Sequence, residues 1–169
     1  MSSHYTVAKD DPPAKQVQAL IALYNQGEMA QTERQCRIAL QAFPRSVTLL
    51  NLLGAAFQMQ GKLDFAASAF AKAIELNPKD AQLHNNYGVV LLALSSFDKA
   101  RACFLKALKL MPDYVEAHNN LGNALCGLEQ LDAALQAGNY RKLAQMSLGH
   151  ALCLLHPANN PNHLAYSMC

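Results

Sequence analysis

Apolar residues recur at steps of three and four positions along most of the chain, which is the period of an amphipathic helix. The segments VTLLNLLGAAFQMQ and LDFAASAFAKAIEL show this period clearly, and a short turn at Gly61-Lys62 separates them. Strand-like patterning is not visible in the sequence. The pattern predicts eight helices, at residues 14–26, 30–43, 47–60, 63–76, 81–94, 97–110, 115–128 and 131–146.

The helical pattern itself repeats every 34 residues, as the prolines Pro44, Pro78 and Pro112 show. Other residues in the same register are Gly54, Gly88 and Gly122; Asp64, Asp98 and Asp132; Ala66, Ala100 and Ala134; and Ala39, Ala73 and Ala107. Each of the first three units therefore consists of two helices and a proline, which prevents the second helix from continuing, whereas no proline closes the fourth unit. Ser46 and Asp80, each two residues after such a proline, are expected to cap the next helix.

These spacings and residue types resemble the tetratricopeptide repeat, whose pattern is W-x2-L-G-x2-Y, then A-x3-F, then P. Residues 47–80 match it at Leu50, Leu53-Gly54, Phe57, Ala66, Phe70 and Pro78, and residues 81–114 match it at His84, Tyr87-Gly88, Leu91, Ala100, Phe104 and Pro112. The resemblance implies an all-α fold, a right-handed α-solenoid of antiparallel helix pairs. Small residues such as Gly54 and Ala66 are expected to let the two helices of a unit approach closely.

The expected organisation is a flexible N-terminal tail at 1–12, a repeat domain at 13–148 and a C-terminal helix remnant with a tail at 149–169. The repeat units lie near 13–46, 47–80, 81–114 and 115–148. The last unit is degenerate, since Gly138 occupies its phenylalanine position and the register is lost after about Gln136. The region beyond is interpreted as a helix that covers the last repeat. The alternatives are that the chain is a piece of a longer array or a natural truncation, and that this helix exchanges with a second molecule.

The resemblance also implies a binding surface, because in the family the first helix of each unit lines a concave groove for extended peptides or partner helices. The groove residues predicted on this basis are Gln18, Tyr24, Asn51, Gln58, Met59, Gln82, Asn85, Asn86, Asn119, Asn120 and Asn123. Most are amides, which carry both donors and acceptors and can pair with the main chain of a peptide. The alternative is that these asparagines are ordinary repeat residues with no ligand role.

The motifs HNNYG and HNNLG resemble the asparagine ladder in the repeats of O-linked N-acetylglucosamine transferases. Asn86 and Asn120 correspond to the ladder position, whereas the second unit has Leu52 there, with Asn51 beside it.

Charge narrows the choice of partner. The chain has 14 Lys+Arg against 12 Asp+Glu, and this near balance disfavours dedicated nucleic-acid binding. Repeats that clamp acidic chaperone tails need Lys and Arg on the inner helices, but the matching positions here hold Val17, Ile21, Gln82 and Asn86. A protein or peptide partner other than such a tail is therefore expected.

The cysteine spacing and the absence of targeting patterns indicate where the protein is expected to reside. The chain shows no signal-peptide pattern and no membrane-spanning apolar stretch, and its five cysteines include no C-x-x-C pair. We therefore expect a cytoplasmic protein with reduced thiols.

No nucleophile, base and orienting group can be assembled, so no catalytic residue, cofactor or metal is expected. His84 and His118 are interpreted as packing residues, and His150-x-x-Cys153-x-x-His156 as part of an ordinary tail.

The function predicted from these features is a non-enzymatic protein interaction module that binds a peptide or partner protein in its groove. One alternative is the substrate-recognition arm of a larger enzyme, such as a glycosyltransferase. Another is a scaffold that assembles with further copies of itself through the C-terminal repeat.

Overall fold

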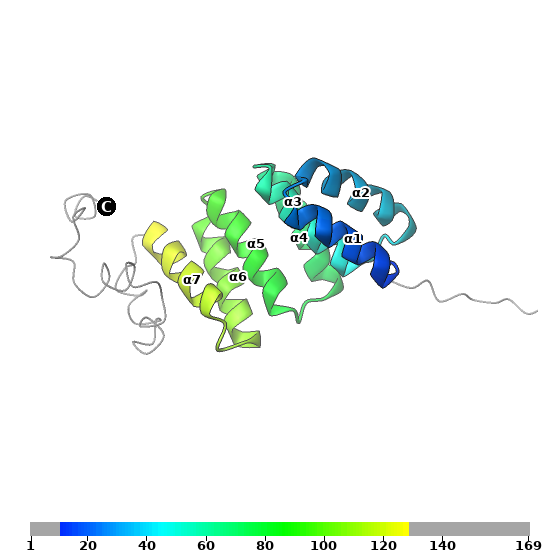
Figure 1. Ribbon diagram of the computed structural model, residues 1–169. Coiled ribbons are helices and arrows are strands. Elements are labelled where there is room, and N and C mark those ends of the chain that lie inside the picture. Colours follow the sequence, from blue (N-terminus) through cyan, green and yellow to red (C-terminus); the bar gives the residue numbers. More distant parts are fainter. Residues whose placement is uncertain (1–10, 129–169) are drawn as a thin grey trace, which may run out of the picture.

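The computed structural model describes residues 11–128, which form seven helices and no strand. They are α1 (Ala14–Asn25), α2 (Met29–Ala42), α3 (Val47–Met59), α4 (Leu63–Leu76), α5 (Ala81–Ala93), α6 (Phe97–Leu110) and α7 (Val115–Gly127). Figure 1 shows them in one row, from α1 and α2 at one end to α7 at the other. The predicted all-α solenoid is confirmed, and each helix begins and ends within one residue of its predicted bounds. The predicted helix 131–146 and the region 149–169 lie outside the described residues.

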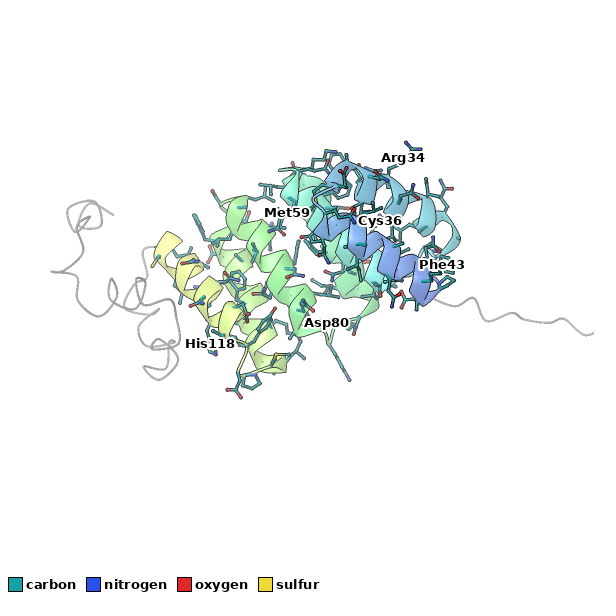
Figure 2. The ribbon with its side chains drawn as sticks, viewed as in Figure 1. Arg34, Cys36, Phe43, Met59, Asp80 and His118 are labelled. Atoms are coloured by element: carbon teal, nitrogen blue, oxygen red, sulfur yellow. The ribbon has the colours of Figure 1, made fainter. Side chains whose placement is uncertain are left out.

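Two of the helix starts are fixed by the residues predicted to cap them. The Ser46 hydroxyl accepts a hydrogen bond from the Leu49 amide at 3.1 Å. Asp80, at the start of α5 in Figure 2, accepts from the amides of Gln82 and Leu83 at 2.9 and 3.2 Å. Both caps satisfy amides that have no partner inside the helix. They place α3 and α5, which carry most of the predicted groove residues.

The buried Ser46 also connects the repeats to the chain before them. Its hydroxyl donates a hydrogen bond to the Asp11 carboxylate, and Pro12 beside it is buried. Asp11, which belongs to the segment predicted as an N-terminal tail, is therefore bonded to the end of the loop between α2 and α3.

The turn between the two helices of a unit needs one residue in the left-handed region. Gly27, Gly61 and Ser95 occupy this position in three successive units, with φ of +82°, +71° and +56°. Glycine adopts this conformation without steric cost, whereas serine does not. The third unit therefore contains a strained turn where the first two do not.

The second and third units are each held together by a glycine on the first helix and a phenylalanine on the second, Gly54 with Phe70 and Gly88 with Phe104. A Cβ atom added at Gly54 would lie 2.8 Å from Phe70 Cε1, and one at Gly88 would lie 2.5 Å from Phe104 Cε1. Both rings are fully buried, as is the small residue Ala66. The predicted close approach of the two helices at Gly54 and Ala66 is therefore confirmed.

The core is spread over successive layers instead of one centre. One buried cluster joins α1 to α5, and a second joins α5, α6 and α7. Two small clusters, around Leu50 and around Ala107, fill the layers near the proline loops. Each layer needs few large rings, which accounts for an aromatic content of only 7% and the absence of Trp.

His84 and His118 hold the loops that precede their helices. The Nε2 atom of His84 donates to the carbonyl of Pro78 at 2.9 Å, and that of His118 (Figure 2) donates to Pro112 at the same distance. A carbonyl only accepts, so each ring carries its proton on Nε2. Their role is structural, as the packing interpretation expected, but it is a repeated hydrogen bond in addition to packing.

Candidate functional site: an amide row along the first helices

The predicted groove residues all lie on α1, α3, α5 and α7, the first helices of the four units. Met59, Gln82, Gln18 and Asn123 are exposed, Asn85 is buried, and the others are half-buried: Tyr24, Asn51, Gln58, Asn86, Asn119 and Asn120. We call Asn51, Asn86, Asn119 and Asn120, with the flanking Gln82 and Asn123, the amide row. No charged side chain is a member of this row.

Two hydrogen bonds join amides of successive units. Asn86 Nδ2 donates to Asn51 Oδ1 at 3.2 Å, and Asn120 Nδ2 donates to Asn85 Oδ1 at 3.0 Å. In both pairs the residues are 35 apart, so the later unit always donates from the position one residue further along its helix. The second asparagine of each HNN motif, Asn86 or Asn120, therefore donates to the previous unit, and the first asparagine of the earlier motif, Asn85, accepts from the next unit.

The junction between the first and second units, called the first junction, shows which residues replace the hydrogen-bonded pair when the asparagines are missing. Val17 and Leu52 occupy these two positions, also 35 residues apart, and both are half-buried. Leu52 packs against the first buried cluster. An apolar pair is therefore an alternative that this fold already contains, and the departure of Leu52 from the ladder pattern follows from Val17 in the unit before it.

Asn85 is used inside the protein. Its side chain is buried, with 6% exposed, and besides Asn120 it forms a hydrogen bond with Tyr114. Burial, followed by the nearby carboxylates of Glu116 and Asp80, raises the pKa of Tyr114, and the bond to Asn85 opposes this rise. These contacts engage the Asn85 side chain within the protein, so Asn85 is not a member of the amide row.

The bond between Asn86 and Asn51 uses one N–H and one lone pair. It leaves an N–H and the carbonyl oxygen of Asn86, and the NH2 group of Asn51, for another partner. The pairing also fixes the orientation of both carboxamides before a ligand arrives, which lowers the entropic cost of binding. The row therefore presents oriented donors and acceptors without charge.

Between residues 11 and 128, no three His, Cys, Asp or Glu side chains are grouped so that they could hold a metal ion. None of the helices described there combines the length and apolar character needed to cross a membrane. His150, Cys153 and His156 lie outside the described residues.

The unit boundary between α2 and α4 carries a charged cluster that the sequence analysis did not single out. Glu33 accepts from Lys62 at 2.7 Å, from Arg37 at 3.1 Å and from Gln60 at 3.1 Å. The hydrogen bond from Lys62 is the main reason that the pKa of Glu33 lies below its usual value, although burial acts against this. Because 29 residues separate Glu33 from Lys62, no local spacing pointed to this cluster.

Comparison with known protein families and structures identifies the repeats. Sequence profiles of the tetratricopeptide repeat match residues 47–80 and 69–102, and a profile described as TPR repeat matches residues 90–128. No match is found among curated protein sequences.

Among solved structures, the O-GlcNAc transferase of Thermobaculum terrenum is similar over 69% of this chain, with 32% identity and a TM-score of 0.61. The match spans only 23% of the transferase chain. Pseudomonas aeruginosa pilF matches over 90% of this chain and 64% of its own, with 21% identity and a TM-score of 0.67.

The first TPR of Spaghetti (RPAP3), bound to the HSP90 peptide SRMEEVD, matches over 69% of this chain and 96% of its own, with 21% identity and a TM-score of 0.65. At this identity, and at that of pilF, the likeness concerns the fold alone. Together with the three profile matches and the observed repeat geometry, these similarities show that the chain belongs to the tetratricopeptide repeat family.

Proposed function

We propose that this protein binds an extended segment of a partner protein along the amide row. The repeat family generally serves protein interaction without catalysis, and the proposal adds the surface and the mode of recognition. The observation that supports it is the pair of half-buried asparagines Asn51 and Asn86, oriented by their mutual bond and with further donors and acceptors left over. We also propose that the role is non-enzymatic.

An extended main chain offers N–H and C=O groups that alternate whatever its side chains are. Uncharged amides complement this alternation, since each carries donors and an acceptor. One such bond contributes about 0.5–1.5 kcal/mol net, so several must form together, or apolar side chains must add to them. Ile21 and Met59, which are 41% and 63% exposed on α1 and α3, are candidates for this apolar contribution.

Acidic-tail binding is not part of the proposal. A structural neighbour binds an HSP90 peptide that contains two glutamates and ends in aspartate. A carboxylate held in a groove needs charge-assisted partners such as Lys or Arg. Because Val17, Ile21, Gln82 and Asn86 occupy the positions where the family carries them, the shared fold does not transfer this specificity.

The first junction supplies the variant that tests the proposal. Asn51→Val combined with Asn86→Leu copies the apolar pair Val17 and Leu52, so it removes the amides and keeps a pair that the fold accepts. A partner should first be identified by affinity capture and mass spectrometry, and its binding segment measured by calorimetry. The double variant should bind that segment roughly tenfold or more weakly, because it loses at least two hydrogen bonds.

Gln31→Ala is the matched control, because Gln31 is an exposed amide on α2, a second helix. It should leave the dissociation constant unchanged. Unchanged binding by the double variant, with its helical content intact, would refute the assignment of the amide row.

The similarity to an O-GlcNAc transferase favours a second candidate function. In this case the repeats form the substrate-recognition arm of a larger glycosyltransferase-like enzyme, and the amide row holds the main chain of its protein substrate. Reading the source gene beyond the codon for Cys169 tests this candidate. A catalytic domain encoded in frame would support it, and a natural stop at that point would rule it out.

The cellular location remains a proposal as well. Cys36, Cys103 and Cys126 are free thiols, which fits a reducing compartment, and we propose the cytoplasm. Fractionation of the source cells tests this directly.

A further inference from the structure

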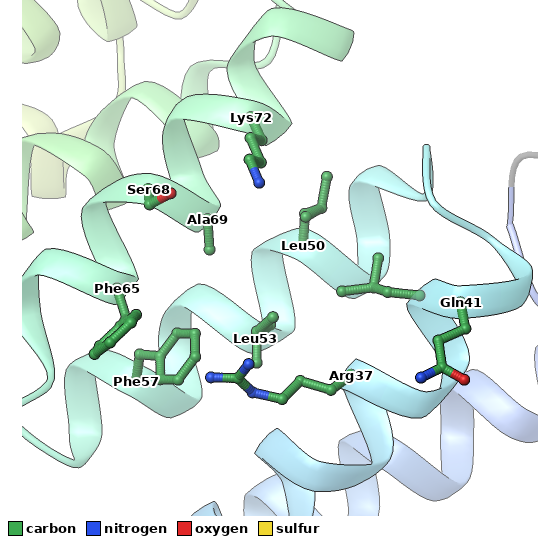
Figure 3. A pocket seen from close by; sticks show the side chains of 10 residues that line it. Arg37, Gln41, Leu50, Leu53, Phe57, Phe65, Ser68, Ala69 and Lys72 are labelled. Carbon is green, nitrogen blue, oxygen red and sulfur yellow. The ribbon is translucent and has the colours of Figure 1, made fainter.

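A hollow of about 480 Å³ lies between α2 and α4, with α3 as its floor (Figure 3). Leu50, Leu53 and Phe57 of α3 form the floor, and Phe65 and Ala69 of α4 form one wall. The volume lies in the range of sites that take up several ligand side chains or a small molecule. The hollow was not recognised from the sequence, because its residues come from three helices and two units.

This hollow and the amide row lie on different faces of α3. Asn51 of the amide row follows Leu50 of the hollow by one position, and the predicted groove residue Gln58 likewise follows Phe57. One residue of an α-helix turns the side chain by about 100°. A partner in the hollow therefore does not compete with a peptide on the amide row.

Phe65 is the most unusual residue of the wall. Its side chain is 59% exposed, and its ring centroid lies 5.5 Å from that of the buried Phe57. The neighbouring units have Gln31 and Lys99 at the same repeat position, and both are exposed. The fold therefore does not require an aromatic residue there, and folding alone gains little from one that stays in water.

Positive charges border the apolar surface on two sides. Figure 3 shows Arg37 of α2 and Lys72 of α4 on opposite sides of the hollow. The Arg37 guanidinium lies 5.2 Å from the centroid of Phe57, and Lys62 Nζ lies 5.9 Å from it. The carboxylate of Glu33 pairs with Arg37 and Lys62, which leaves a net positive border, and none of the ten lining residues is acidic.

We propose that this hollow is a second docking site, which takes a short segment of a partner protein with an apolar side chain flanked by carboxylates. The apolar side chain packs on Phe57 and Phe65, and the carboxylates pair with Arg37 and Lys72. Arg37 is already held over the ring of Phe57, so its guanidinium loses little freedom when it binds. Phe65, an exposed aromatic residue in the wall of an apolar hollow with a charged border, has the character of an interface anchor.

The repeat itself provides the variants for the test. Phe65→Lys copies Lys99 of the next unit and removes the anchor, and Lys72→Glu reverses one border charge. Lys106→Glu is the control, because Lys106 occupies the position of Lys72 in the next unit and is equally exposed. Helical content and thermal midpoint of each variant verify that it folds.

The probes are short synthetic peptides with a central Leu-Phe pair, flanked either by glutamates or by lysines. Binding is followed by two-dimensional NMR of the labelled full chain. The glutamate peptide should shift signals of Phe57, Phe65 and Ala69, and it should bind at least about tenfold more tightly than the lysine peptide. Phe65→Lys should weaken binding of the glutamate peptide at least tenfold. Lys72→Glu should remove most of the preference for the glutamate peptide, because it brings the border charge from net positive to neutral, and Lys106→Glu should change neither.

Several results would overturn the proposal. They are equal binding of both peptides, shifts confined to the amide row, or no shift at about 1 mM peptide, where even weak binding is detected. Shifts at the hollow that grow with protein concentration in the absence of peptide would replace the partner by a second copy of this chain. Because the Asn51→Val and Asn86→Leu variant should bind the glutamate peptide normally, failure of this proposal is distinguishable from failure of the amide-row proposal.

Discussion

Replacement of Gly88 by alanine tests whether the contact between Gly88 and Phe104 holds the third repeat unit together. An added Cβ would lie 2.5 Å from Cε1 of Phe104, and 2.9 Å from both Cδ1 and Cζ. Carbon atoms normally pack at about 3.5–4.0 Å, so the ring or the helix must move by about 1 Å. Phe104 is fully buried, and buried side chains are close-packed, so such a shift displaces the neighbouring side chains as well.

Two opposing effects set the magnitude. Alanine is better than glycine in a helix interior by about 1 kcal/mol. Overpacking a buried site costs about 1–3 kcal/mol, and the rigid Cβ against a fully buried ring places this site at the upper end. Gly88→Ala should therefore lower the free energy of unfolding by about 2 kcal/mol, although alanine favours the helix.

The free energy of unfolding can be measured by urea titration followed by circular dichroism. Gly127→Ala is the control, since its added Cβ would also lie 2.5 Å from a ring carbon, but Phe97 is only half-buried and Gly127 is exposed at the end of α7. This variant should stay within about 0.5 kcal/mol of the wild type.

A double-mutant cycle tests whether the loss of stability comes from the clash with the Phe104 ring. Phe104→Leu should cost less in the Gly88→Ala background than alone, because the smaller side chain relieves the clash. Stabilisation of the protein by Gly88→Ala, as at an ordinary exposed helix position, would refute the packing argument.

Three further outcomes follow from particular residues. Ser95→Gly should raise the free energy of unfolding by about 0.5–1 kcal/mol, because the turn has φ of +56°, whereas Gly61→Ser should lower it; thermal unfolding checks both signs. The pKa of Glu33 is lowered in the folded protein, so its ion pairs stabilise the fold fully above the unfolded pKa near 4.5. This stabilisation is lost as the pH falls through the lower folded pKa. The free energy of unfolding should therefore fall less steeply in acid for Glu33→Gln than for the wild type. Cys36 is buried, which raises its pKa to about 11, whereas Cys126 is exposed. Iodoacetamide at pH 8 should therefore modify Cys126 well before Cys36, and urea should remove this difference. Peptide mapping by mass spectrometry measures both modifications.

The sequence was sufficient for features that one unit determines by itself. Helix bounds, the caps at Ser46 and Asp80 and the small residue Gly54 follow from local spacing and were predicted correctly. Helical periodicity and capping act over a few residues, and the 34-residue repeat allowed each unit to verify the others.

Features between units were less accessible to sequence reasoning. The bond from Asn120 to the buried Asn85 depends on how one first helix lies against the next, which a single unit does not specify. The paired asparagines of the HNN motifs were the available signal, because two successive side chains of a helix face different directions and so reach different neighbours. The hollow beside Phe65 gave no signal except an aromatic residue where the adjacent units have Gln31 and Lys99.

The central claim is that amides on the first helices hold a partner's main chain. Side-chain carboxamide signals are visible directly in NMR spectra of the labelled protein, and the binding segment of a captured partner can be titrated against them. We predict saturable shifts of the Asn51, Asn86 and Asn120 carboxamides, which disappear for Asn51 and Asn86 when Val and Leu replace them. Binding of the same segment with these carboxamide signals unmoved would contradict the account.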